Sequence, residues 1–393
     1  MPKYTVDNII RLKSPVNISE PGGGKFNPET NRWSYASSTE GFPGKRTKSI
    51  QVALPAADNT AGEDGPGVQR LPILPGNSLR GELRRCAAKL VIDAIVARGE
   101  IITFDLFHIL MCGAASASPD GSTSIGFATR AMRNPMAALF GGGPQMIWSR
   151  YSTGIGFPIN AQTIDLGFVP PSMGIYSAGN GRLTATAMDV RVDDILRGNS
   201  NAPSAIANLD NEIIRWVESI SDGKEARAEA KKNKAQKGAE INPTAAQRPL
   251  QSLTATEYLL PGLSFYSKDT LDTDLTGAAL LGLYVLMRVA SANNNRLGGC
   301  RRNGFGHFSI TSICRRSDGA SFELMQENDG IYAANLAEDE VREAVNAWQE
   351  WAQSSCSAAS VAEAFSLPKD AQNPAVAVPT AETAEGVTAT TTK

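Results

Sequence analysis

Two long segments with helical periodicity, each flanked by strand-like segments, constrain the fold of this chain more than any other feature. Apolar side chains recur at helical spacing through residues 77–98, and Gly99 can end that helix. The segment "DTDLTGAALLGLYVLMRVASANN" predicts a second helix, with Asp272 or Thr273 at its cap. Residues 4–12, 252–268 and 304–316 have strand-like patterns, and the second contains a kink.

This order of elements predicts an α+β fold of the ferredoxin-like βαββαβ type, as in RNA-recognition motifs. The predicted core is discontinuous and comprises residues 1–14, 71–140 and 250–320. The rest of the chain divides into a Gly/Pro-rich first-loop insertion (15–70), an insert region (141–249) with a flexible charged loop (221–249), a C-terminal helical segment (321–366) and a disordered tail (367–393).

Composition favours an ordinary intracellular protein. The 393 residues are 42% hydrophobic and 20% charged, and no apolar run is long enough to cross a membrane. The amino terminus lacks the apolar stretch of a signal peptide, and the five cysteines lack framework spacing, so we expect a cytoplasmic location. The net charge of -2 does not indicate a nucleic-acid partner, but cations cluster locally at Arg80, Arg84, Arg85, Arg296, Arg301 and Arg302.

The first cluster lies in "LPGNSLRGELRR", where a proline and a glycine precede the first helix. Asn77 or Ser78 can cap the helix, whose first N–H groups form a natural anion site. Gly81 leaves room for a ligand, and Arg80 and Arg84 add positive charge suited to phosphate. A capped helix with a solvated basic face is the alternative.

The second cluster lies in "NNNRLGGCRRNGFGHFSI", which leads from the second helix into a strand. Its glycines permit close approach of an extended backbone, and its arginines offer forked donors to phosphates. The segment has neither P-loop nor dinucleotide-binding spacing. In a βαββαβ fold, this loop and the start of the first helix can face one groove.

Metal and cofactor signals are weak. His108 and Cys112 are four residues apart, but one such pair is half a zinc site at best, so we expect a buried structural pair. We expect no cofactor and no metal.

Four ordered motifs resemble the RAMP superfamily of CRISPR-associated proteins, and within it backbone subunits of the Cas seven type, most closely those of type IV. "LPGNSLRGELR" resembles the signature of the first helix, and "ALFGGG" at 138–143 resembles the element that often follows it. "EYLLPGLSFYSK" resembles a strand pair of that family, and "RLGGCRRNGFGHFSI" resembles its glycine-rich loop.

The resemblance implies a palm of RNA-recognition-motif type with a projecting thumb, stacked in many copies along one CRISPR RNA. It implies RNA contacts at Asn77, Ser78, Arg80, Arg84, Arg85, Arg296, Gly298, Gly299, Arg301, Arg302 and Gly304. We place the thumb between about 145 and 215, with Met173, Ile175 and Tyr176 as candidate tips. Implied partners are target DNA or RNA, Cas-five-like and Cas-six-like subunits, a large or small subunit and, in some subtypes, a helicase.

Catalysis is not expected. Relatives that cut RNA use an aspartate after the first strand, whereas "KSPVNISEPGGG" has none. Glu20, Asp58 or Asp64 are the possible substitutes for a metal-binding carboxylate, so an endoribonuclease of the same fold stays an alternative. A small-molecule phosphate-binding enzyme that uses the glycine-rich loop is the third hypothesis.

Overall fold

An antiparallel sheet with helices packed on one face forms the centre of the protein in this computed structural model. The structure describes residues 3–18, 24–27, 32–35, 45–47, 49–55, 61–62, 65–66, 68–113, 125–143, 147–177, 181–191, 252–274, 276–299 and 304–365. The predictions for Glu20, Asp58, Asp64, Arg301, Arg302, the loop 221–249 and the tail 367–393 lie outside these residues.

The central strand of the sheet is β1 (Lys3–Leu12), which pairs with β13 (Ser264–Asp272) on one side and β14 (Phe308–Arg316) on the other. The sheet order is β10-β13-β1-β14-β15, and β9 also pairs with β13. The short strands are β9 (Tyr151–Thr153), β10 (Phe157–Pro158) and β15 (Ser321–Glu323). These pairings are all antiparallel.

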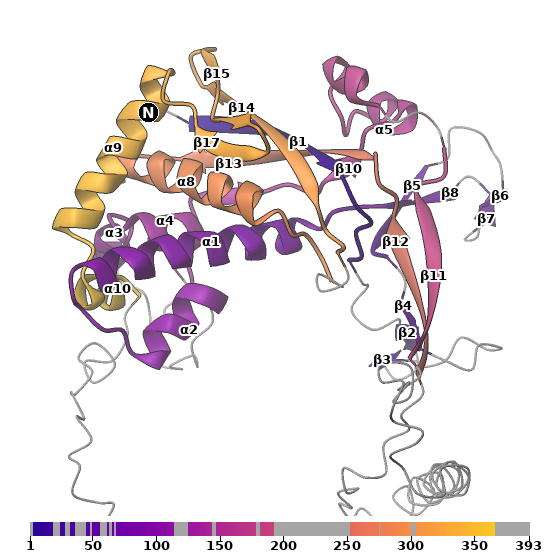
Figure 1. Cartoon of the computed structure of the whole chain (residues 1–393), viewed down its shortest axis with the longest axis horizontal. Coiled ribbons are helices and arrows are strands. Elements are labelled where there is room, and N and C mark those ends of the chain that lie inside the picture. The colour runs from indigo at the N-terminus through magenta and orange to yellow at the C-terminus, as the bar shows by residue number, and fades with distance from the viewer. Residues whose placement is uncertain are drawn as a thin grey trace, which may run out of the picture.

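Side chains alternate between the two faces of β1, and the helices cover one of them. Tyr4 and Val6 belong to the main core, which also contains apolar residues of α1 (Gly76–Ala97), α8 (Ala278–Asn294) and α9 (Asp339–Ser354). Figure 1 shows α8 and α1 side by side beneath the sheet. The same core includes residues of the shorter helices α2 (Phe104–Cys112), α4 (Pro135–Phe140) and α10 (Ala358–Ala364), and α3 (Ile125–Ala131) packs against α10.

The other face of the sheet, here called the open face, is partly covered by one short segment. Ile9 and Tyr266 pack there against Ile159, Val169 and Met173. Val169 and Met173 belong to a cover segment, residues 161–176, which contains α5 (Ala161–Asp165), the 3-10 helix η1 (Pro171–Tyr176) and the link between them. Figure 1 shows α5 on the side of the sheet opposite to α8.

A second sheet extends away from the central one. It contains β11 (Thr184–Arg191), β12 (Ser252–Leu259) and β4 (Lys45–Thr47), and Figure 1 shows β11 and β12 as a long pair. The remaining strands form pairs: β2 (Gly24–Asn27) with β3 (Arg32–Tyr35), β5 (Gln51–Pro55) with β8 (Val68–Pro72), β6 (Ala61–Gly62) with β7 (Gly65–Pro66), and β16 (Met325–Asn328) with β17 (Ile331–Ala334).

The structure differs from the sequence-based expectation in three places. Both strands predicted at 252–268 form, but they do not pair with each other: β12 joins a second sheet, and β13 joins the central sheet, where β9 and β10 pair with it at the edge. These two strands come from the predicted insert region. The second helix starts at Ala278 because Asp272 continues β13 opposite Lys3. The segment predicted as helical at 321–366 first forms strands, and α9 and α10 follow.

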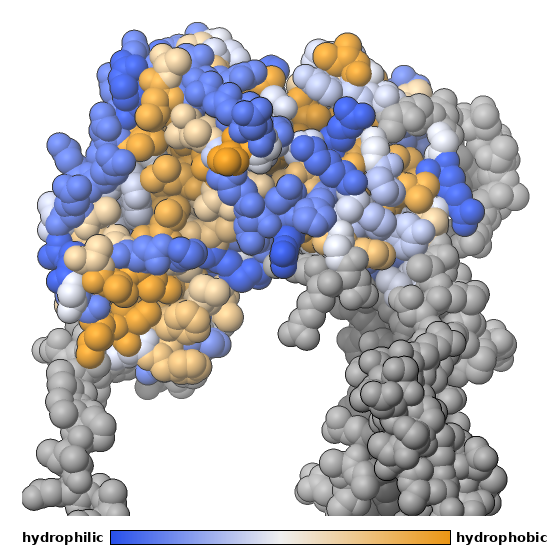
Figure 2. Space-filling view, viewed as in Figure 1, coloured by the Kyte–Doolittle hydropathy of each residue, from blue (hydrophilic) through white to orange (hydrophobic). Residues whose placement is uncertain are grey.

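Hydrophobic residues gather over the corner formed by α2 and α10, whereas the outward side of α1 is a hydrophilic stripe (Figure 2). His108 and Cys112 are both exposed on α2, so the expectation of a buried pair was wrong. Within the described ranges, no group of metal-ligating side chains is large enough to hold an ion. None of the helices in that part of the chain combines the length and apolarity of a membrane span.

Candidate nucleic-acid interface

The first turn of α1 presents two polar side chains without a capping role. The helix begins at Gly76, and Pro75 at its N-cap position offers no side-chain hydrogen bond. The expected caps, Asn77 and Ser78, lie inside the first turn, where Asn77 is exposed and Ser78 is half-buried. Capping was therefore the wrong role for them. Their side chains have no hydrogen-bond partner in the described part of the chain and remain free to meet a ligand.

The glycine-rich loop packs against residues 14–18, which follow β1. The backbone N–H of Gly299 donates to the Asn17 carbonyl at 2.7 Å, and that of Gly306 donates to the Pro15 carbonyl at 2.8 Å. Gly298 has a φ of +77°, and a Cβ there would lie 2.3 Å from the Asn17 carbonyl oxygen. The sequence predicts that a ligand backbone approaches Gly298 closely, but in the structure the chain's own backbone at Asn17 lies there.

The structure brings the start of α1 and the beginning of the glycine-rich loop together. The side chain of Asn294, at the end of α8, donates to one oxygen of Glu82 at 2.9 Å. Arg85 donates to the other oxygen at 2.6 Å. Leu79 of α1 and Leu297 of the loop belong to one apolar cluster. The predicted convergence of the two segments is therefore present.

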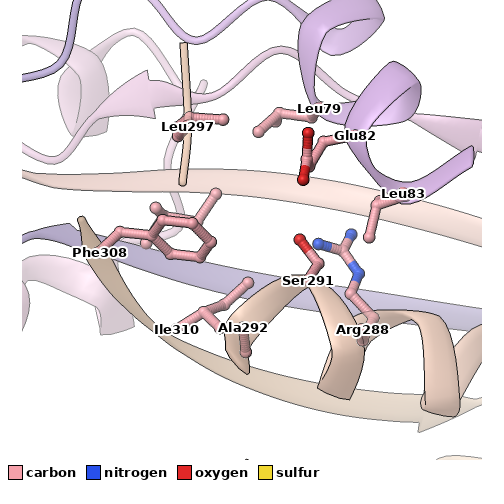
Figure 3. Close-up of a pocket in the computed structure, with 10 residues that line it drawn as sticks. Leu79, Glu82, Leu83, Arg288, Ser291, Ala292, Leu297, Phe308 and Ile310 are labelled. Atoms are coloured by element: carbon pink, nitrogen blue, oxygen red, sulfur yellow. The ribbon is translucent and has the colours of Figure 1, made fainter. Parts of the chain in front are cut away.

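A small cavity lies between these elements. Figure 3 shows Glu82 of α1 and Arg288 of α8 directed into it, with Leu297 and Phe308 at one side. Its volume of about 20 Å³ suits one water molecule and is too small for a nucleotide. Ligand contacts at this end of the sheet therefore have to be made from the outer surface.

The outer surface carries several potential donors to phosphate. Asn77, Arg296 and Gly299 are exposed, and Arg85 is half-exposed beside Glu82. Gly304 is exposed with a φ of +78° and has open space around it. These residues and Ser78 are the predicted site residues that the structure leaves accessible.

Arg80 and Arg84 have structural partners instead. The guanidinium of Arg84 donates to the carbonyls of Leu110 and Ile109, each at 2.9 Å, and lies near that of Gly141. Its side chain is buried, with 8% of the residue exposed. Arg80 donates to the carbonyls of Phe140 at 2.9 Å and Tyr151 at 2.7 Å. The acceptors at Ile109 and Leu110 are carbonyls in the last turn of α2, and that of Ile109 also accepts the backbone N–H of Gly113 at 2.8 Å.

The electrostatics agree with burial of these arginines. Burial lowers the pKa of Arg84 to about 10, and the neighbouring Arg80 adds to the effect. Burial also lowers the pKa of Arg80. The guanidinium groups of both residues are directed at backbone carbonyls. The structure therefore does not support Arg84 as a phosphate ligand.

We expect Arg84→Met to lower the free energy of unfolding by about 2 kcal/mol, because hydrogen bonds from a charged donor contribute about 1.5–3 kcal/mol. Thermal unfolding followed by circular dichroism measures the loss. The salt dependence of RNA binding by the folded variant should stay unchanged. A variant as stable as the wild type with a reduced salt slope would show that Arg84 binds phosphate after all.

The candidate thumb tips lie on the open face and not on a projecting hairpin. Met173 is buried, with 4% exposed, in the cluster under η1, so it cannot serve as a tip. Ile175 is 82% exposed and Tyr176 is 37% exposed, on the same 3-10 helix. The long projecting element in the described residues is the β11–β12 pair, which begins at Thr184.

Sequence reasoning missed Glu82, the residue that ties α1 to the end of α8. The available signal was its position, because it falls beside Leu79 and Leu83 on the apolar stripe of the helix, where an acid is unexpected. Sequence reasoning also missed Asn17. Its side-chain amide donates to the Glu257 carbonyl at 2.6 Å, and its backbone carbonyl accepts the N–H of Gly299. A single asparagine in a long loop gives no such signal.

Comparisons with known proteins give a likeness to solved structures alone. No family model matches the chain, and no curated protein matches it. Among solved structures, it is similar to a chain of a type IV-B CRISPR complex, with 14% sequence identity and a TM-score of 0.43. That match covers 78% of this chain and 90% of the other.

Proposed function

We propose that this chain is a non-catalytic RNA-binding backbone subunit of a type IV CRISPR effector complex. In this proposal, its copies stack along a guide RNA and present it for pairing with a target nucleic acid. The palm consists of the central sheet with α1 and α8. The strand order β13-β1-β14, with both helices on one face, supports a palm of RNA-recognition-motif type.

The contacts among the four family-like motifs support this proposal. Arg80 in the first motif donates to the Phe140 carbonyl in the second, at 2.9 Å. Leu79 in the first motif shares a cluster with Leu297 in the fourth. Tyr258 in the third motif packs edge-on against Phe305 in the fourth, with ring centroids 5.8 Å apart. Segments far apart in the sequence thus form one connected structure.

The observation that carries the proposal is the convergence of the first turn of α1 with the glycine-rich loop. A helix N-terminus attracts negative charge through its free N–H groups and its dipole. Asn77, Ser78 and Arg296 add side-chain donors at the same end of the sheet. Phosphate contacts of this kind hold a strand without reading its sequence, as a subunit that binds any guide requires.

The experiment that tests the proposal is purification after expression with and without a CRISPR array and the partner subunits. Particle mass and the length of RNA protected from nuclease are then measured. We expect a large particle with protected RNA when the array is present. A nucleic-acid-free monomer under all conditions would refute the proposal, and metal-dependent cleavage of bound RNA would refute its non-catalytic part.

We expect Arg296→Glu to weaken binding to all RNA sequences alike. The slope of log affinity against log salt concentration should fall by about 0.7 for single strands, because one phosphate contact is lost. Fluorescence anisotropy with two labelled RNAs of unrelated sequence measures the slope. Arg133→Glu is the matched control, because Arg133 is an exposed cation on the loop between α3 and α4. Equal slopes for the two variants would remove Arg296 from the interface.

A further inference from the structure

A basic pocket lies on the open face of the central sheet, at the end where β1 begins. It has a volume of about 290 Å³, and its lining includes Lys3, Lys268 and Arg315 with the hydroxyls of Thr5 and Ser317. Its cations come from three strands that are far apart in sequence. Lys268 lies directly opposite Asp7 on β1, and Arg315 lies opposite Thr5.

The acids in and beside this pocket are already neutralised. Asp7 is buried and pairs with Arg315 at 3.0 Å, while its other oxygen accepts the Tyr266 hydroxyl at 2.6 Å. Asp272, which lies opposite Lys3, pairs with Arg150 at 2.9 Å.

The pocket therefore has a net positive charge. Arg316, at the rim, pairs with Glu340 at 2.7 Å and with Asp318. Lys3 and Lys268 are exposed and have no carboxylate partner among the described residues. Because Arg316 shares its one charge between two carboxylates, the two ammonium groups leave a net excess of one positive charge, which an anion would compensate.

The chemistry of the lining fits a phosphate group. Ammonium groups bind phosphate as point charges, and hydroxyls donate to its remaining oxygens. The Arg315 side chain is 53% exposed and uses one nitrogen on Asp7, so other guanidinium N–H groups face solvent. Tyr266 stays a neutral donor to Asp7, because burial and then that hydrogen bond raise its pKa.

The pocket is remote from the interface described above. The glycine-rich loop contacts the chain just after the last residue of β1, whereas Lys3 is the first residue of that strand. Ten residues at about 3.3 Å each separate the two ends by roughly 30 Å. The pocket also lies on the face of the sheet that α1 does not cover. One phosphate cannot contact both places.

We propose that this pocket binds a backbone phosphate of a nucleic-acid strand independently of the interface formed by α1 and the glycine-rich loop. The identification of the anion as nucleic acid rests on the proposed function. The phosphate site itself rests on the charges and the geometry of the open face. In an assembled particle, it gives the palm a second contact with nucleic acid, on the side away from the guide.

The test compares Lys268→Glu, Arg296→Glu and the double variant with the wild-type full-length protein. Labelled single-stranded RNA and single-stranded DNA of mixed sequence are the probes, titrated at several salt concentrations. We expect Lys268→Glu to reduce the salt slope by about 0.7. The effect should add to that of Arg296→Glu in the double variant, because the sites are independent. Arg133→Glu controls for the change in net charge.

Three results would overturn the proposal. The first is a slope for Lys268→Glu equal to that of the Arg133→Glu control. The second is an effect of Lys268→Glu on the salt slope that vanishes once Arg296 is replaced, which would mean that the two residues contribute to one site. The third is lost affinity for polyglutamate with unchanged affinity for both nucleic acids, which would assign the pocket to an acidic protein segment.

The same titration separates this proposal from the proposed function. Failure of the wild-type protein to retain guide RNA refutes the backbone role. An additive slope change from Lys268 in the free protein would still establish the second phosphate site. Conversely, the Lys268→Glu variant could form a particle that protects RNA normally while the free variant shows no change in salt slope. That result would refute only the second site.

Discussion

Arg288→Met should destabilise this protein more than any other single change considered, by about 3–5 kcal/mol. Arg288 is buried, with 3% exposed, and forms an ion pair with Asp269, which is fully buried. The Tyr284 hydroxyl donates to the same Asp269 oxygen at 2.7 Å. Within the described residues, the other oxygen of Asp269 is buried without a hydrogen-bond partner. Removing Arg288 would leave a buried carboxylate without its countercharge.

The pKa of Arg288 reflects the same arrangement. Burial alone would lower it, but the Asp269 carboxylate beside the guanidinium raises it above the ordinary value. Thermal and urea unfolding measure the stability of Arg288→Met. The double variant Asp269→Asn with Arg288→Met should recover part of the loss, because it removes both charges and keeps an acceptor for Tyr284. A double variant as unstable as the single one would attribute the loss to packing instead of charge.

The second large effect is expected from Gly282→Ala, at the crossing of α8 and α9. A Cβ at Gly282 would lie 2.0 Å from the Ala344 carbonyl oxygen and 2.8 Å from the Trp348 Cβ. The Ala344 carbonyl belongs to the backbone and cannot move aside as a flexible side chain can. Helices α8 and α9 would therefore have to separate. We expect a loss of about 3 kcal/mol, at the upper end of the usual cost of overpacking, measured by thermal unfolding.

Gly81→Ala is the matched control, because it makes the same chemical change in a helix. The nearest atom to a Cβ at Gly81 is the end of the Arg85 side chain at 3.7 Å. Alanine there should be neutral or stabilise the helix by about 0.5–1 kcal/mol. Equal losses in the two variants would contradict the close helix contact at Gly282.

The parts of the fold that depend on local pattern are predictable from the sequence. The first helix is expected at 77–98 and found at Gly76–Ala97, because its apolar stripe and Gly99 are local signals. The strands at β1 and β14 follow from alternation in the same way. The partner of a strand is not a local property. The sequence predicts β12 as a strand, but it pairs with β11 and β4 in a separate sheet.

The candidate site likewise has parts that the sequence predicts and parts that it does not. The convergence of the first helix and the glycine-rich loop follows from the predicted topology. The roles of single side chains do not, because their partners are distant in sequence. Arg84 lies off the apolar stripe, so the sequence predicts a surface cation. In the structure it donates to carbonyls of α2 that are 25 and 26 residues away. The pocket at Lys3 and Lys268 needs three strands that only the folded chain brings together.

The central position of β1 has a consequence for synthesis of the protein. Strand β1 leaves the ribosome long before its partners β13 and β14, since Asp7 and the Tyr266 hydroxyl that donates to it are 259 residues apart in sequence. At about 5–20 residues per second, roughly 13–50 s pass between them. During that time the nascent chain carries an apolar strand with both edges unpaired, which is a template for misassembly. Yield in a foreign host should therefore depend on chaperones that hold β1 until β13 and β14 have been made.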